Sequence, residues 1–188
     1  MDPLTHVFLP LLVAYVVRPD LFSRPRYMAL AGFGLLPDFD KLIGIPGLLH
    51  SLVTLAPICL ALLVFERRVR GNVQYSGIAV LFIVSHLLLD VVEGVTVPLL
   101  FPLVTIGVGF AYPMEVVFGT GPLGFSFQGW PVTLESGEPR TGYAASDDVD
   151  TNTFGFINSF GIATTLAFAT AYIGREYLWN TDVSATAD

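Results

Sequence analysis

The sequence predicts an all-α, polytopic membrane protein, a helical bundle with about five transmembrane helices and one re-entrant or interfacial segment. Hydrophobic residues make up 53% of the 188 residues and charged residues only 13%, which is about half the charged share of soluble proteins. The mean hydropathy of +0.67 is typical of chains whose outer surface faces lipid. Apolar runs also alternate with short arginine clusters, as expected where helices end at a membrane surface.

Four apolar runs in the first half of the chain predict helices: Pro3–Val17, Tyr27–Pro37, Leu48–Phe65 and Tyr75–Val92. The first run begins with a proline, which suits the first turn of a helix, and follows an aspartate, which favours a helix N-terminus. The second run is short, because as a helix it covers roughly 16 Å, about half of the hydrocarbon core. The third and fourth runs are long enough to span the bilayer. The short polar turn between them predicts a transmembrane helical hairpin.

The second half of the chain is less regular. Val97–Tyr112 is apolar but contains Pro98 and Pro102, which favours a re-entrant or interfacial segment over a clean crossing. The stretch that follows is rich in glycine, proline and acidic residues. It also contains the aromatic residues Phe118, Phe125, Phe127, Trp130 and Tyr143. The predicted organisation is therefore a membrane-embedded metal-site core (1–112), an extramembrane loop (113–154), a final transmembrane helix (155–175) and a flexible tail (176–188).

The charge distribution excludes some classes of protein and suggests a source. The net charge is −7, nine of the sixteen acidic residues follow Tyr112, and Lys41 is the single lysine. An acidic, lysine-poor surface is favoured in high salt, which leads to the hypothesis of a halophilic archaeon. The basic clusters are small and flank apolar runs, so we expect no nucleic-acid partner. Cys59 is the sole cysteine and excludes an intramolecular disulfide.

The arginines also predict an orientation in the cell membrane. They follow the first, third and last apolar runs, and basic residues in short loops stay in the cytoplasm. The multi-pass chain is then expected to have an outer N-terminus and a cytoplasmic C-terminus. This orientation brings six polar residues from four segments to the outer face: His6, Asp38, Asp40, His50, His86 and Asp90.

His86 and Asp90 are the most informative pair, since the i,i+4 spacing puts both on one face of a helix. A carboxylate within a membrane helix costs about 2.5–3.5 kcal/mol and usually has a partner and a function. The pair therefore suits two ligands of one metal. The alternative is that the two side chains hydrogen-bond to each other at the outer interface.

The other candidate ligands are weaker when taken singly. Asp38 and Asp40 follow Pro37 and either bind a divalent ion or simply end a helix in solvent. His50 precedes Ser51, a pair that either contributes a ligand or caps the next helix. His6 lies near the chain start, where a histidine is more often incidental.

Taken together, three histidines and three aspartates predict a divalent metal site. Histidine favours Zn²⁺, while the carboxylates also admit Mn²⁺, Fe²⁺ or Mg²⁺. A metal there would lower the pKa of a bound water to ~7 and polarise a phosphoryl or carbonyl oxygen. We expect Asp40 and Asp90 to be the catalytic carboxylates.

A family resemblance points in the same direction. The segments MDPLTH, LLPDFD, LLHS, SHLLLD and VPLLFPL, in this order, resemble the inner-membrane, membrane-bound metal-dependent hydrolases, some of which are described as LexA-binding. That family is distantly similar to zinc-dependent phospholipase C and the P1-type nucleases. The resemblance covers about the first 105 residues and implies metal-dependent hydrolysis, with ligands at the six residues named above. Many relatives carry His-Arg-Gly-x-Thr-His-Ser where this chain has Ile45-Pro46-Gly47-Leu48-Leu49-His50-Ser51.

Two function classes follow. The first is a membrane-bound hydrolase that acts on a phosphoester, with membrane lipid as the expected partner and phospholipid as an expected substrate. The second is a non-enzymatic membrane protein whose polar cluster is structural. A channel is disfavoured, because the inner halves of the third and fourth runs, Pro57–Phe65 and Ser76–Val84, are almost entirely apolar.

Overall fold

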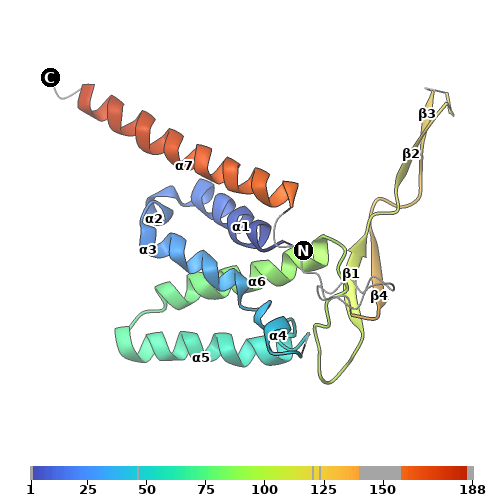
Figure 1. Ribbon diagram of the computed structural model, residues 1–188, viewed down its shortest axis with the longest axis horizontal. Helices are drawn as coiled ribbons and strands as arrows, with labels where there is room; N and C mark the ends of the chain where they lie inside the picture. Colours follow the sequence, from blue (N-terminus) through green and yellow to red (C-terminus); the bar gives the residue numbers. More distant parts are fainter. Residues whose placement is uncertain (1, 46, 120, 123, 140–157, 186–188) are drawn as a thin grey trace. The chain divides into compact units, whose positions relative to one another are not determined.

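The computed structural model describes residues 2–45, 47–119, 121–122, 124–139 and 158–185 (Figure 1). The chain divides into two compact units, which are described separately below. Unit 1 contains residues 1–37, 58–86 and 153–188, and unit 2 contains residues 38–57 and 87–152. Both long helices of the central part of the sequence contribute residues to each unit.

Unit 1 is helical. Its elements are α1 (Pro3–Val17), α2 (Pro19–Phe22), α3 (Pro25–Met28), the 3₁₀ helix η1 (Ala29–Leu35), most of α5 (Leu52–Arg70), most of α6 (Gln74–Val92), and α7 (Ser159–Ala185). A proline occupies the first position of each of the first three helices, where its missing N–H costs nothing. Asp2 caps α1, since its carboxylate accepts hydrogen bonds from the amides of Leu4 and Thr5.

The core of unit 1 is aromatic and joins α1 to α7, which lie side by side (Figure 1). Tyr15 contacts Phe168 edge-on at 5.8 Å between ring centroids, and Phe168 stacks on Tyr172 at 6.0 Å. The two helices also approach closely at Gly161, where an added Cβ would lie 2.2 Å from an oxygen of Asp2. A methyl group at this contact would therefore displace the Asp2 carboxylate that caps α1.

The third and fourth apolar runs form α5 and α6, joined by a turn at Gly71 with φ of 72°. Positive φ favours glycine there. Glu66 links the two helices, because its carboxylate accepts hydrogen bonds from the backbone amides of Tyr75 and Ser76 in the first turn of α6. The glutamate thereby satisfies amides that a helix N-terminus leaves unpaired.

Unit 2 contains α4 (Phe39–Leu42), one end of α5, one end of α6 and four strands. The strands β1 (Gly107–Ala111) and β4 (Thr133–Gly137) pair antiparallel, as do β2 (Glu115–Phe118) and β3 (Phe125–Gln128). An added Cβ at Gly109 would lie 2.6 Å from the carbonyl oxygen of Val95. Strand β1 therefore needs glycine to pass this close to the segment after α6.

The prediction of about five transmembrane helices is wrong. The described residues form seven α-helices, of which one, α6, is long and apolar enough to cross a membrane. A crossing needs about 20 apolar residues, whereas α1 has 15 residues and an internal Pro10. The second run, Tyr27–Pro37, forms the end of α3 and the 3₁₀ helix η1 instead of one α-helix.

Two further helices have the length but not the composition of a crossing. Helix α5 has 19 residues, but its last turn carries Arg67, Arg68 and Arg70. Helix α7 has 27 residues, yet threonines and glycines interrupt its apolar surface, and it does not meet the hydropathy of a membrane span. Apolar runs and arginine boundaries thus overstate the number of crossings.

The fold is also not all-α. The expected re-entrant segment Val97–Tyr112 contains β1 and a bridge between Val97 and Val108, and the expected loop holds β2, β3 and β4. Valine and aromatic residues in this region, as in Glu115–Phe118, carry a strand signal that the glycines and prolines obscured. Tyr143 and the first three residues of the predicted final helix, 155–157, lie outside the described residues.

Candidate metal centre

Asp40 organises the polar cluster of unit 2. Asp40 belongs to α4, and its side chain is fully buried. One oxygen, Oδ2, accepts hydrogen bonds from the amides of Gly47 at 2.8 Å and Leu49 at 3.2 Å. The same oxygen lies 2.7 Å from Nδ1 of His50. The carboxylate thus holds both the turn before α5 and the ring of the histidine.

His50 has carboxylates around both ring nitrogens. Its Nε2 lies 3.3 Å from Oδ2 of Asp90 and 3.8 Å from Oδ1 of Asp38, while Nδ1 faces Asp40. Burial of the imidazole opposes its protonation, but the hydrogen bonds to Asp40 and Asp90 outweigh this cost and raise the pKa of His50 to about 9. A ring held at Nδ1 by a carboxylate, with Nε2 facing further oxygens, is the arrangement found in metal-ligating histidines.

The residues of unit 2 fit a divalent cation. Oδ1 of Asp40 is buried and has no hydrogen-bond partner within the part of the chain that the structure describes. A buried carboxylate oxygen without a partner is costly, and a cation would offset that cost. The donors, one imidazole nitrogen and carboxylate oxygens, suit Zn²⁺, Mn²⁺ or Fe²⁺.

Asp38 and Ser51 also have local roles. Lys41 forms an ion pair with Asp38, as a base beside these aspartates suggests. The hydroxyl of Ser51 accepts a hydrogen bond from the amide of Val53 at 3.1 Å and donates to the carbonyl of Phe101. The interpretation of Ser51 as a helix cap is therefore confirmed.

The remaining two predicted residues form a pair in unit 1. His6 on α1 and His86 on α6 are both buried, and their ring centroids lie 4.1 Å apart. Nδ1 of His6 lies 3.1 Å from the carbonyl oxygen of Asp2, which fixes the orientation of the ring. An added Cβ at Gly34 would lie 3.1 Å from the carbonyl oxygen of His6, which shows how closely η1 packs beside this residue.

The structure thus brings Asp38, Asp40, His50 and Asp90 together in unit 2, and His6 and His86 together in unit 1. Among the described residues, histidine and aspartate side chains form groups whose potential ligand atoms lie within 4.8 Å of one another, a spacing that could hold a metal ion. The ligand assignment itself stays a prediction. Sequence reasoning missed the amides of Gly47 and Leu49, for which the only signal was the glycine that lets the turn form.

Comparisons with known proteins add the family. Neither the curated proteins nor the solved structures gave a match. The family comparison matches residues 1–182 to the YdjM inner membrane protein family. That description supports a membrane location and names no activity or cofactor. Because the match covers almost the whole chain of 188 residues, this protein belongs to the YdjM inner membrane protein family.

Proposed function

We propose that this inner membrane protein is a metal-dependent hydrolase that acts on a phosphoester of the kind found in phospholipids. The observation that carries the proposal is the position of His50, held at Nδ1 by Asp40 and facing the carboxylates of Asp38 and Asp90 at Nε2. A divalent cation held by these side chains would act on a phosphoester, and the membrane location of the family favours a lipid substrate.

Asp38, Asp40, His50 and Asp90 are the residues of unit 2 that would hold the cation. His6 and His86 are the predicted ligands of unit 1. A cation bound there would lower the pKa of a water molecule and would polarise a phosphoryl oxygen. Asp40 orients the His50 ring through its hydrogen bond to Nδ1. We assign to Oδ2 of Asp90 the role of accepting a proton during hydrolysis.

The proposal includes an orientation in the membrane. Arginines precede α6, the candidate crossing, so its Gln74 end is assigned to the cytoplasm and its Asp90 end to the outer side. The outer N-terminus and cytoplasmic C-terminus predicted from the arginines remain part of the proposal. A reporter fused after Asp188 tests the second of these.

One observation favours the non-enzymatic alternative. Oδ2 of Asp40 already accepts two backbone hydrogen bonds and faces His50. A carboxylate engaged in this way also suits a purely structural cluster. In such a cluster, the ion pair with His50 and the hydrogen bonds to the turn stabilise the fold and bind no metal.

The test compares metal content and hydrolysis in matched aspartate variants. Asp38→Ala and Asp90→Asn should each sharply reduce the divalent metal that the purified protein retains, measured by elemental analysis. Both should also abolish cleavage of a phosphodiester reporter. Asp20→Asn is the control, because the side chain of Asp20 is 91% exposed on α2.

The outcomes separate the two functions. An enzyme loses turnover in Asp90→Asn while its thermal unfolding stays close to that of the wild type. A structural metal site loses thermal stability instead, and the wild type cleaves no phosphoester. Absence of stoichiometric metal from the wild type, even after reconstitution, would reject the metal site altogether.

A further inference from the structure

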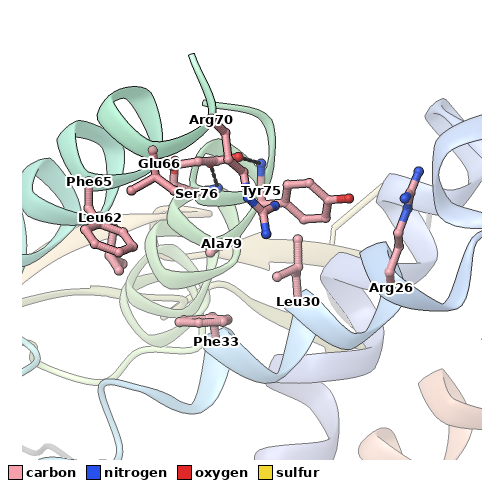
Figure 2. A pocket seen from close by; sticks show the side chains of 11 residues that line it. Arg26, Leu30, Phe33, Leu62, Phe65, Glu66, Arg70, Tyr75, Ser76 and Ala79 are labelled. Carbon is pink, nitrogen blue, oxygen red and sulfur yellow. Dashed lines mark hydrogen bonds between the residues drawn. The ribbon is translucent and has the colours of Figure 1, made fainter. Parts of the chain in front are cut away.

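Unit 1 contains a pocket that the proposed hydrolase does not use. It has a volume of about 470 Å³ and is lined by residues of α3, η1, α5 and α6 (Figure 2). This volume lies within the roughly 300–1,000 Å³ of pockets that take small ligands. Its walls are of two kinds, one cationic and aromatic and the other apolar.

The cationic wall is built on Tyr75. The guanidinium carbon of Arg70 lies 4.6 Å from the centroid of the Tyr75 ring, and that of Arg26 lies 5.9 Å from it. Tyr27 stacks on Tyr75 at 5.2 Å and lies under Arg26 at 4.9 Å. Stacking occupies the flat face of a guanidinium and leaves the N–H donors in its plane available for an anion.

The acidic residue in the lining does not repel an anion strongly. Glu66 accepts hydrogen bonds from the amide and the hydroxyl of Ser76, both at 2.6 Å. Its charge also faces the positive end of the α6 dipole. Two arginines against one compensated glutamate leave the pocket positive.

The other wall is apolar and open to the surroundings. Phe65 and Val69 are 68% and 65% exposed, and Phe33 is 38% exposed. In Figure 2, Leu62 and Phe65 lie on the opposite side of the view from Arg26, with Phe33 below. A small soluble anion gains nothing from such a wall, whereas an anion with a hydrocarbon chain does.

We propose that this pocket binds the headgroup of an anionic phospholipid, with the phosphate between Arg26 and Arg70 and the first acyl carbons on Phe33, Leu62 and Phe65. The pocket lies at the first turns of α6, the helix that is apolar enough to cross the membrane. The orientation proposed above, on which this inference rests, assigns this end to the cytoplasm, and the cytoplasmic leaflet carries the anionic lipids that basic pockets recognise. The lipid site is independent of the metal centre.

The experiment titrates the full-length protein, in a zwitterionic detergent, with short-chain phosphatidylglycerol. The variant Arg26→Gln with Arg70→Gln should bind at least about tenfold more weakly, because two charge-assisted contacts are lost. Arg67→Gln with Arg68→Gln is the control. It removes the same charge from exposed positions outside the pocket and should bind within about twofold of the wild type.

Three further arms make the result decisive. Short-chain phosphatidylcholine should bind weakly, and inorganic phosphate should not compete at millimolar concentration. Phe65→Ser alters an exposed side chain, so it should fold normally and still weaken binding of the lipid. Equal loss in the control double variant, or competition by free phosphate as strong as by the lipid, would overturn the proposal.

Discussion

At the scale of single residues, His50 is the centre of the polar cluster in unit 2. It is almost fully buried, yet three carboxylates surround it, so the charged imidazolium is the stable form at neutral pH. A metal ion would have to replace the proton on Nε2. The proton and the cation therefore compete for one nitrogen. The affinity of the protein for metal should rise with pH until His50 of the metal-free protein has lost its proton.

The raised pKa of His50 predicts how the stability of the metal-free protein depends on pH. The pKa is 6.5 for a free histidine and about 9 in the fold. Protonated His50 therefore contributes stability that is fully present below pH 6.5 and is lost as the pH rises toward 9. Thermal unfolding of chelator-treated protein should show a midpoint that falls across this range.

The control for this prediction is His50→Gln, which cannot be protonated. Its unfolding midpoint should be lower than that of the wild type at pH 6 and should not show the same fall toward alkaline pH. A wild-type midpoint that is constant from pH 6 to pH 9 would show that the carboxylates do not hold a proton on the ring.

The residues of this cluster could be predicted in part from the sequence. Asp38 and Asp40 follow a proline, and Asp90 lies in an apolar run, so their chemistry stands out against its surroundings. The hydrogen bonds of Asp40 could not be predicted, because they depend on the turn at Gly47, where φ is 93°. The sequence shows a glycine there but not which amides its turn directs at a carboxylate.

At the scale of elements, the long helices are the best predicted feature. Apolar runs correctly marked α1, α5 and α6 as helices, within a few residues at each end. Strand β1 was missed because it contains Gly107 and Gly109, which have weak strand propensity. Those glycines are needed for the close approach to Val95 and Thr96, a tertiary contact that local sequence does not reveal.

The contact between α1 and α7 predicts opposite effects of the same substitution at two glycines of α7. Gly161→Ala should destabilise the protein by about 1–3 kcal/mol, because the new methyl group would collide with Asp2 and disturb the cap of α1. Gly174→Ala meets no atom within 4 Å and should stabilise the helix by about 0.5–1 kcal/mol. Denaturant unfolding of the two variants, measured side by side, checks both signs. Stabilisation by Gly161→Ala would show that α7 does not pack at Asp2.

At the scale of the whole molecule, composition correctly indicated a membrane protein, and the family match supports it. The number of crossings was overestimated because the hydropathy of a run does not show where a helix ends. The second run forms the end of α3 and the 3₁₀ helix η1, and both are too short to span. Many exposed apolar side chains remain on other elements, which suits contact with lipid without a full crossing.

The orientation proposed for α6 predicts on which side of the helix an introduced cysteine reacts with a thiol reagent that cannot cross the membrane. In a Cys59→Ser background, Asn72→Cys lies in the arginine-bounded turn before α6 and should be labelled only after the membrane is opened. Leu103→Cys, at a residue that is 77% exposed after α6, should be labelled in intact cells. The reverse pattern would move the polar cluster to the cytoplasmic side.

The hydrogen bonds that Asp40 accepts from Gly47 and Leu49 give the cluster a built-in reporter. Both amides lose their acceptor when the Asp40 carboxylate moves, so the rate of exchange with solvent deuterium should be slowed by a similar factor at both. That rate follows the integrity of the cluster without any ligand, substrate or assay of turnover. A cation added to the protein should then slow exchange at both amides in parallel, which makes the pair a gauge of occupancy inside a bilayer.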